Sequence, residues 1–189
     1  EKAASSHSPT EEGTGQIIPL PPCDVTKKSD LEACYQELSK REKQIDLLIC
    51  AAGISGAKAE PDKEEASSLK AKLWDNETFE DWNTTYNTDV TAVYFSTVAF
   101  LPLLQAGTEK RGHLHSSVIV ISSMSGLMRH SQGHFSYNAA KGGTVQLTKL
   151  MSAEFQKIRI RVNSIAPGYF PSEMSAKESG EDMKSELPA

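Results

Sequence analysis

The chain has 189 residues, of which 38% are hydrophobic and 24% charged, and its formal net charge at pH 7 is -5. This is the composition of one soluble globular domain, and it argues against a basic nucleic-acid-binding surface. The three cysteines form no C-x-x-C pair, which argues against a disulfide framework. The longest apolar stretch, residues 92–104, is too short to span a bilayer. We therefore expect a cytoplasmic protein without nucleic-acid or membrane partners.

The first half of the chain contains two predicted strands and two predicted helices. Residues 16–25 have the pattern of a short buried strand that ends in an acid, and the capping-box sequence at residues 29–32 predicts the start of a helix. Residues 45–52 are a continuous apolar run followed by Gly53, the pattern of a strand covered on both faces. A polar connection over residues 55–76 then leads to a helix from Thr78 to about Gln105, which Pro102 should bend or end.

The second half alternates in the same way. Residues 118–121 and 158–165 are predicted strands, and residues 136–155 are a predicted helix between them. Strands separated by helices imply crossover connections and a mostly parallel sheet. The predicted fold is a doubly wound, Rossmann-like α/β domain with three layers (αβα). No linker divides residues 1–189 into two domains.

Four of the predicted strands end in residues that suit a ligand site. Asp24, Gly53, Ser123 and the pair Pro167-Gly168 each follow a strand. Because a doubly wound sheet binds ligands outside the carboxyl ends of its strands, we expect one crevice there. Simpler roles remain open for two of these residues: Asp24 would begin a turn before Thr26, and Gly53 would relieve strain at a strand end.

Tyr137 and Lys141 are the strongest chemical signal in the sequence. They lie four residues apart in the run SYNAAKGG, so on a helix they share one face. A free tyrosine is a poor acid or base at neutral pH, but a nearby cation favours its phenolate form. Ser123 precedes the tyrosine by fourteen residues and offers a hydroxyl to a substrate oxygen. The trio predicts a proton-transfer site.

Other chemistries fit the sequence less well. The five histidines show no metal-ligand spacing with carboxylates or cysteines, so we expect no metal site. Ser123 and His134 suggest an acyl-transfer pair, but the chain has no Gly-x-Ser-x-Gly elbow. We expect His134 and Arg129 to border a substrate instead.

Three motifs in order give the chain a family resemblance. Ser123 to Gly126, Tyr137 to Lys141 and Asn163 to Gly168 match the Ser-x-x-Gly, Tyr-x-x-x-Lys and Asn-x-x-x-Pro-Gly blocks of short-chain dehydrogenases/reductases. The resemblance covers residues 17–174 and is closest to fungal members. It implies an oxidoreductase that moves a hydride between a nicotinamide cofactor and a carbonyl or secondary alcohol.

The resemblance also assigns roles to individual residues. Tyr137 is the general acid/base, Lys141 favours its phenolate and holds the nicotinamide ribose, and Ser123 positions the substrate oxygen. Asp89 falls where the family often has an asparagine that supports a proton relay. The cofactor, NAD or NADP, is expected to contact Asp24, Val25, Ala52, Gly53, Tyr137, Lys141, Pro167, Gly168, Phe170 and Ser172.

The chain departs from the family pattern in three places. Asp89 cannot donate a hydrogen bond when ionised, and Cys50-Ala51 replace the usual Asn-Asn before Ala52-Gly53. The Gly-rich turn that would receive the pyrophosphate at a helix N-terminus does not occur in these residues. The sequence therefore predicts a domain truncated at both ends, itself inactive, from a longer enzyme that forms homo-oligomers. The rival hypothesis is a non-catalytic Rossmann-like binding or assembly module.

Overall fold

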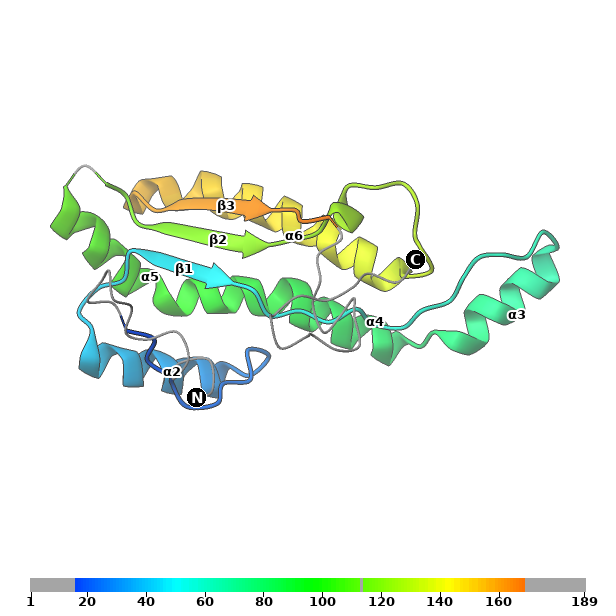
Figure 1. The fold of residues 1–189 in the computed structure, drawn as a ribbon, viewed down its shortest axis with the longest axis horizontal. Coiled ribbons are helices and arrows are strands. Elements are labelled where there is room, and N and C mark those ends of the chain that lie inside the picture. The colour runs from blue at the N-terminus through cyan, green and yellow to red at the C-terminus, as the bar shows by residue number, and fades with distance from the viewer. Residues whose placement is uncertain (1–15, 113, 169–189) are drawn as a thin grey trace.

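The computed structural model describes residues 16–112 and 114–168, and Figure 1 shows the arrangement of the elements. The longer helices are α2 (Lys28–Arg41), α3 (Ala66–Asn76), α4 (Phe79–Tyr86), α5 (Ala92–Arg111) and α6 (Phe135–Glu154). The strands are β1 (Leu47–Cys50), β2 (Ser117–Ile121) and β3 (Arg161–Ile165). A π-helical turn, η1 (Asn87–Thr91), joins α4 to α5, and two 3-10 turns are η2 (Met124–Gly126) and η3 (Phe155–Ile158).

The three strands form one parallel sheet in the order β1-β2-β3. Leu48 of β1 pairs with Val118 of β2, which pairs with Val162 of β3. Helices connect successive strands, as parallel pairing requires. The predicted Rossmann-like α/β class is confirmed.

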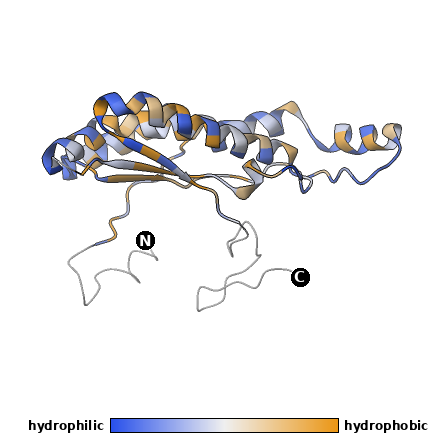
Figure 2. Ribbon diagram, turned by 90° about the horizontal axis from the view of Figure 1, so that it is seen from above, coloured by the Kyte–Doolittle hydropathy of each residue, from blue (hydrophilic) through white to orange (hydrophobic). Residues whose placement is uncertain are grey.

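The core lies between the sheet and the helices on one of its faces (Figure 2). Its buried members come from α5, β2, α6, β3 and the residue before β3: Val93, Phe100, Leu103, Leu104, Val118, Val120, Met151, Ile160 and Val162. Along β1 the exposure alternates, so Leu47 and Ile49 are exposed on the opposite face. The prediction that both faces of this strand are covered is therefore wrong for the described residues, which build the sheet and one helical layer.

Residues 16–25 do not form the predicted strand. Within the described residues this segment joins no strand ladder, and β1 is an edge strand of the sheet. Pro19, Pro21 and Pro22 remove three backbone donors here, which disfavours a ladder. The segment instead lines an apolar groove of ≈ 350 Å³ with α2, β1 and α5.

Residues 55–76, predicted as a polar connection, contain α3. This helix stands on an arm that extends from the body of the molecule (Figure 1), and none of its residues is buried. Its N-cap is Glu65, whose carboxylate accepts hydrogen bonds from the Ser67 and Ser68 amides. Glutamate is not a usual capping residue, so no familiar sequence signal marks this helix start.

The helix predicted from Thr78 begins as expected. Thr78 and Asp81 exchange side-chain and backbone hydrogen bonds in a capping box. Pro102 does not end the helix, which continues to Arg111. By length and composition, the helical stretch Phe79–Arg111 is apolar enough to cross a membrane. Four of its apolar side chains instead belong to the core described above.

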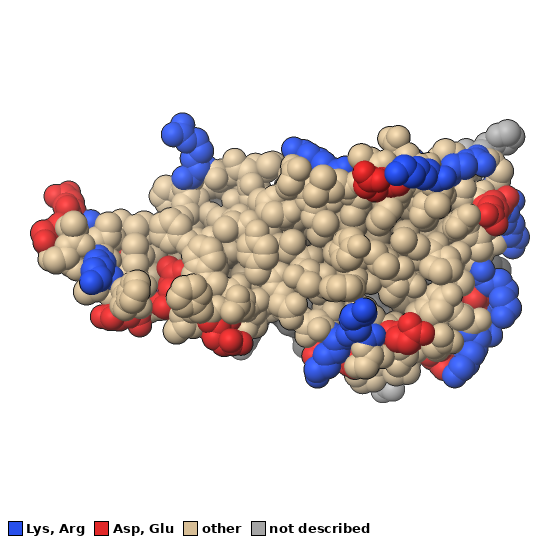
Figure 3. Space-filling view, turned by 180° about the vertical axis from the view of Figure 1, so that it is seen from behind, with Lys and Arg blue, Asp and Glu red and all other residues tan. Residues whose placement is uncertain are grey.

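Acidic and basic side chains are mixed around the rim of the face shown in Figure 3, with uncharged residues between them. The described residues on this face show no continuous basic stripe. The mixed distribution agrees with the modest net charge of -5.

Candidate active site

The ends of β2 and β3 are tied together at the carboxyl edge of the sheet. The Ser122 amide donates to Ile165 O at 2.8 Å, and the Met124 amide donates to Pro167 O at 2.9 Å. Pro167 and Gly168 therefore lie beside the turn that carries Ser123. Two other residues expected at this cofactor site, Phe170 and Ser172, lie outside the described residues.

Ser123 sits at the start of η2 in an extended backbone conformation. Its Oγ accepts a hydrogen bond from the Ser125 amide at 3.1 Å, so the hydroxyl hydrogen stays available to another acceptor. The turn is pressed against α6: a Cβ on Gly126 would lie 2.5 Å from the Lys141 carbonyl carbon. Ser122 Oγ also donates to Lys141 O at 3.1 Å. The Ser123 turn and the Lys141 turn are thus packed together as one unit.

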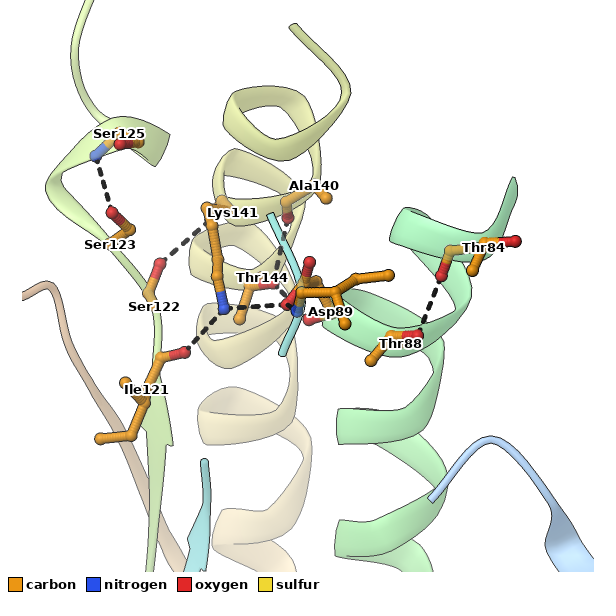
Figure 4. Close-up of polar contacts among 11 residues, drawn as sticks. Thr84, Thr88, Asp89, Ile121, Ser122, Ser123, Ser125, Ala140, Lys141 and Thr144 are labelled. Atoms are coloured by element: carbon orange, nitrogen blue, oxygen red, sulfur yellow. Dashed lines mark hydrogen bonds and ion pairs between the residues drawn. The ribbon is translucent and has the colours of Figure 1, made fainter. Parts of the chain in front are cut away.

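Lys141 is almost completely buried, with 4% of its surface exposed. Its Nζ donates to Ile121 O at 3.2 Å and forms an ion pair with Asp89 Oδ1 at 3.1 Å (Figure 4). The same Nζ lies 5.5 Å from the ring centroid of Tyr137, one helical turn earlier. The cation is therefore placed next to the phenol, as the spacing predicted.

Tyr137 is half-buried near the start of α6. The ring of His134 meets it edge-on with 6.4 Å between centroids. His134 Nδ1 is buried and has no hydrogen-bond partner among the described residues. This histidine therefore borders the tyrosine, and its expected contact with a substrate stays a prediction.

Asp89 is fully buried and lies in the π-helical turn η1. Its Oδ1 accepts from Lys141 and from the Ile54 amide at 3.3 Å, while Oδ2 has no hydrogen-bond partner within the described part of the chain. Burial raises the pKa of this carboxyl, and Lys141 and the Ile54 amide oppose that shift. Asp89 thus pairs directly with the lysine of the predicted trio.

The π-helical turn explains how Asp89 reaches this place. The Ala92 amide bonds to Asn87 O, five residues back, and the extra residue widens the turn. Thr144 of α6 donates its hydroxyl to Asp89 O at 2.7 Å. Short π-helical turns inside helices often mark functional sites. Sequence reasoning missed this turn and its support from Thr144, because no local pattern signals either.

Gly53 follows β1 and provides the space that the ion pair needs. A Cβ at this position would lie 2.5 Å from Asp89 Oδ1 and 3.2 Å from Lys141 Nζ. Its φ angle is not in the left-handed region, so close approach, rather than backbone strain, requires glycine here. The strain-relief alternative considered for Gly53 is therefore not needed.

We expect the change Gly53→Ala to destabilise the domain by about 1–3 kcal/mol, because a methyl group would overpack the Asp89–Lys141 pair. Urea unfolding measures the loss. Gly142→Ala is the matched control, since its Cβ would meet only Gly126 O, at 3.3 Å, and alanine favours the helix. Equal free energies of unfolding for the wild type and Gly53→Ala would show that Asp89 and Lys141 move to accommodate the methyl group at no measurable cost.

Cys50 occupies the first position of the expected Asn-Asn pair and plays a packing role. Its Sγ lies 3.8 Å from Thr97 Oγ1 of α5, and burial raises the pKa of the thiol. Ala51 and Ala52, which follow it, are exposed. Neither Cys50 nor Ala51 carries a side-chain amide that could brace neighbouring strands.

Asp24 forms the turn that the simpler alternative described. Its carboxylate accepts from the Thr26 amide and hydroxyl at 3.0 and 2.7 Å and pairs with Lys27 at 3.1 Å. These bonds, those from Thr26 first, lower the pKa of Asp24 to about 2. Asp24 also lines a hollow of ≈ 830 Å³ with Ile54 and Asn87. Val25 and Ala52 line the apolar groove beside β1 instead.

The structure thus brings Ser123, Tyr137, Lys141, Asp89 and Gly53 together, with Pro167 and Gly168 beside the Ser123 turn. Among the described residues, no group of three His, Cys, Asp or Glu side chains is placed to hold a metal ion. The arrangement offers a hydroxyl, a phenol and a buried cation on one edge of the sheet. Such a set suits proton exchange with an oxygen atom.

Known proteins resemble the chain over most of its length. A short-chain dehydrogenase/reductase of Diaporthe leptostromiformis is 38% identical over 171 residues, covering 86% of this chain and 56% of that relative. One from Stachybotrys chartarum is 34% identical over 190 residues, covering 93% and 68%. The chain thus spans little more than half the length of the first of these relatives.

Solved structures share the fold. The Pseudomonas aeruginosa RhlG/NADP active-site complex has a TM-score of 0.67 and 25% identity, covering 82% of this chain and 54% of that one. A short-chain type dehydrogenase/reductase from Mycobacterium marinum has a TM-score of 0.65 and 28% identity, and the match covers 82% of this chain and 54% of that one. A family model described as short chain dehydrogenase matches residues 1–183. The chain belongs to the short-chain dehydrogenase family.

Proposed function

We propose that these residues carry the catalytic part of an NAD- or NADP-dependent oxidoreductase that interconverts a carbonyl compound and a secondary alcohol. Tyr137 is the general acid/base, Lys141 supports it electrostatically, and Ser123 positions the substrate oxygen. The observation that carries the proposal is the buried ammonium of Lys141, 5.5 Å from the Tyr137 ring, on a helix turn locked to the Ser123 turn. Family membership supports the reaction class.

The residues at the carboxyl edge fit a nicotinamide cofactor. Ala51, Ala52 and Gly168 are small and exposed, so they leave room for a flat ring and a ribose. Lys141 has three N–H donors and uses two of them on Asp89 and Ile121 O, which leaves one for a ribose hydroxyl. When bound, the cofactor supplies or accepts the hydride. Solved neighbours include an NADP complex and an NAD+-bound xylitol dehydrogenase, so the proposal covers both cofactors.

Proton transfer is the task of the protein itself. During reduction the Tyr137 hydroxyl gives its proton to the substrate oxygen, and the positive charge of Lys141 stabilises the phenolate that remains. Ser123 donates a hydrogen bond to the same oxygen as negative charge develops there. During oxidation the phenolate takes the proton back. The half-buried position of Tyr137 limits competing hydrogen bonds from water.

We propose these activities for the complete gene product that contains the chain, and we propose that residues 1–189 are inactive by themselves. The described residues present no Gly-rich turn after a strand to receive a pyrophosphate. We further propose a cytoplasmic enzyme with a small-molecule carbonyl or alcohol substrate.

A homo-oligomer is also part of the proposal. Four small residues of α6 would permit close packing on a second copy: Ala139, Ala140, Gly142 and Gly143. One of them is used by a contact within the chain. Within this chain, a Cβ on Gly143 would lie 2.9 Å from the Tyr86 hydroxyl, so that glycine accommodates α4. Exposed Phe79 and Trp82 on α4 remain available to a partner subunit. Analytical ultracentrifugation of the complete gene product tests this assembly.

The test of the proposed function is the change in nicotinamide absorbance when the complete gene product meets NADH or NADPH and a panel of ketones, and NAD+ or NADP+ and a panel of alcohols. Turnover with one cofactor and one substrate class supports the proposal. Binding of a nicotinamide cofactor with no turnover across both panels would favour the alternative, a non-catalytic Rossmann-like module. Two departures from the family pattern favour that alternative: Asp89 at a position where the family often has asparagine, and Cys50-Ala51 in place of the usual Asn-Asn.

A further inference from the structure

We propose that Asp89 is a positioning residue that holds Lys141 in place by charge, and that the proton it gains at low pH sets the acid limit of the reaction. This inference rests on the proposed function of Tyr137 and Lys141. Asp89 stands at a position where the family often has an asparagine that supports a proton relay. Asp89 itself does not touch the reacting atoms.

The geometry shows that Asp89 determines where the ammonium of Lys141 lies. Asp89 Oδ1 and Ile121 O, at 3.1 and 3.2 Å, hold Nζ from two sides. The Ile121 carbonyl is fixed within the sheet, and Asp89 is fixed by the Thr144 hydroxyl and the Ile54 amide. Loss of the Asp89 charge would leave Nζ with neutral acceptors alone.

The burial of both partners makes the charge important. Asp89 has no exposed surface and Lys141 has 4%, so water screens their attraction little. Asp89 Oδ2 has no hydrogen-bond partner among the described residues, so the ionised carboxylate depends on Lys141 and on one backbone amide for compensation. An unpaired polar atom at such depth disfavours the charged form.

Few charged or titratable groups lie near the Asp89 carboxyl in the described part of the chain. From α6, Lys141 faces its carboxylate directly, and the titratable Tyr137 lies beyond that lysine. The loop after β1 contributes the Ile54 amide to the carboxylate, whereas the neutral Thr144 hydroxyl bonds to the backbone carbonyl of Asp89. Within the described ranges, Lys141 is the charged group that interacts with the carboxyl. Protonation of Asp89 therefore removes the counter-charge of the lysine.

Two pH effects of opposite sign follow. Burial raises the pKa of Asp89, so protonation begins at a higher pH than for an ordinary carboxyl. Because the folded state then binds this proton more tightly than the unfolded state, the associated stability is present below the ordinary carboxyl range and is lost as pH rises through the folded-state pKa. The reaction behaves oppositely, because Lys141 is held correctly only when Asp89 is ionised. A residue with only a packing role would not couple the pH dependence of stability to the pH dependence of the reaction rate.

The test compares the wild type, Asp89→Asn and the control Asp62→Asn in the complete gene product. Asparagine keeps the size and one acceptor for Lys141 but removes the group that titrates. Because the neutral asparagine resembles the protonated carboxyl, Asp89→Asn should turn over more slowly than the wild type at neutral pH, at about the rate that the wild type reaches below its acid limb. Its rate profile should lack that limb. Asp62 pairs with Lys72 on the exposed arm, so its replacement should leave the limb unchanged. KM and kcat recorded across the profile show whether the change lies in turnover.

Each outcome decides a separate point. Turnover with the same acid limb in the wild type and Asp89→Asn overturns the inference and leaves the proposed function intact, whereas a wild type without turnover overturns both. If Asp89→Asn fails to fold, carboxyl 13C titration of the wild type replaces it. The Asp89 resonance should then titrate at higher pH than that of Asp62, whose pKa Lys72 lowers, and a titration at or below that of Asp62 overturns the inference.

Discussion

Tyr137→Phe is expected to lower turnover of the complete gene product by about 10²–10⁴-fold, the usual contribution of a general acid/base. The change removes only the phenolic oxygen, and the ring keeps its edge-on contact with His134 and its place 5.5 Å from Lys141 Nζ. The half-buried side chain of the variant therefore has no proton to transfer, but its packing is unchanged. The initial rate of nicotinamide absorbance change measures the loss.

Two controls separate chemistry from structure in this experiment. Cofactor affinity, measured by quenching of tryptophan fluorescence, should stay within a few-fold of the wild type, because Lys141 and the strand ends are unchanged. Tyr94→Phe changes an exposed tyrosine of α5 that meets Phe95 edge-on, and its turnover should equal that of the wild type. Undiminished turnover in Tyr137→Phe would remove the tyrosine from the mechanism.

Asp89→Leu is expected to destabilise the domain by about 3–5 kcal/mol at neutral pH, the loss typical when one partner of a buried ion pair is removed. Leucine has a similar size, so the cost comes from the charge of Lys141, which is left buried beside the Ile121 carbonyl. The Ile54 amide also loses its carboxylate acceptor. Urea unfolding followed by circular dichroism measures the change.

The matched control for this change is Asp62→Leu. Its ion pair with Lys72 is exposed, so solvent already screens the attraction and the unfolding midpoint should not move measurably. A midpoint for Asp89→Leu equal to that of the wild type would mean that Lys141 escapes to solvent when its partner is lost. The buried pair would then have no structural role.

Much of the fold and the site could be predicted from the sequence because the relevant signals are local. Spacing of four residues placed Tyr137 and Lys141 on one helix face, and apolar runs located β1, β2 and β3 to within a few residues. The strand ends then brought Gly53 and Ser123 to one edge. Parallel sheets make this step dependable, since all carboxyl ends lie at the same edge.

The features that sequence reasoning missed depend on tertiary contacts. The π-helical turn at Asp89 is supported by the Thr144 hydroxyl from α6, and no local pattern encodes that contact. The requirement for Gly53 arises from Asp89, which lies 36 residues later in the chain. Residues 16–25 have the apolar character of a strand, but their prolines lack the donors that a ladder with β1 would need. The apolar periodicity of a segment predicts which of its faces is buried. It does not predict which other segment packs against that face.

The most direct test of the central claim is deuteride transfer. The complete gene product is supplied with reduced nicotinamide cofactor that carries deuterium at the transferable position and with the ketone that turns over fastest. We predict that mass spectrometry finds deuterium on the former carbonyl carbon of the alcohol product, at a rate that falls with Tyr137→Phe. An alcohol product without deuterium, or the same rate in both proteins, would contradict the account.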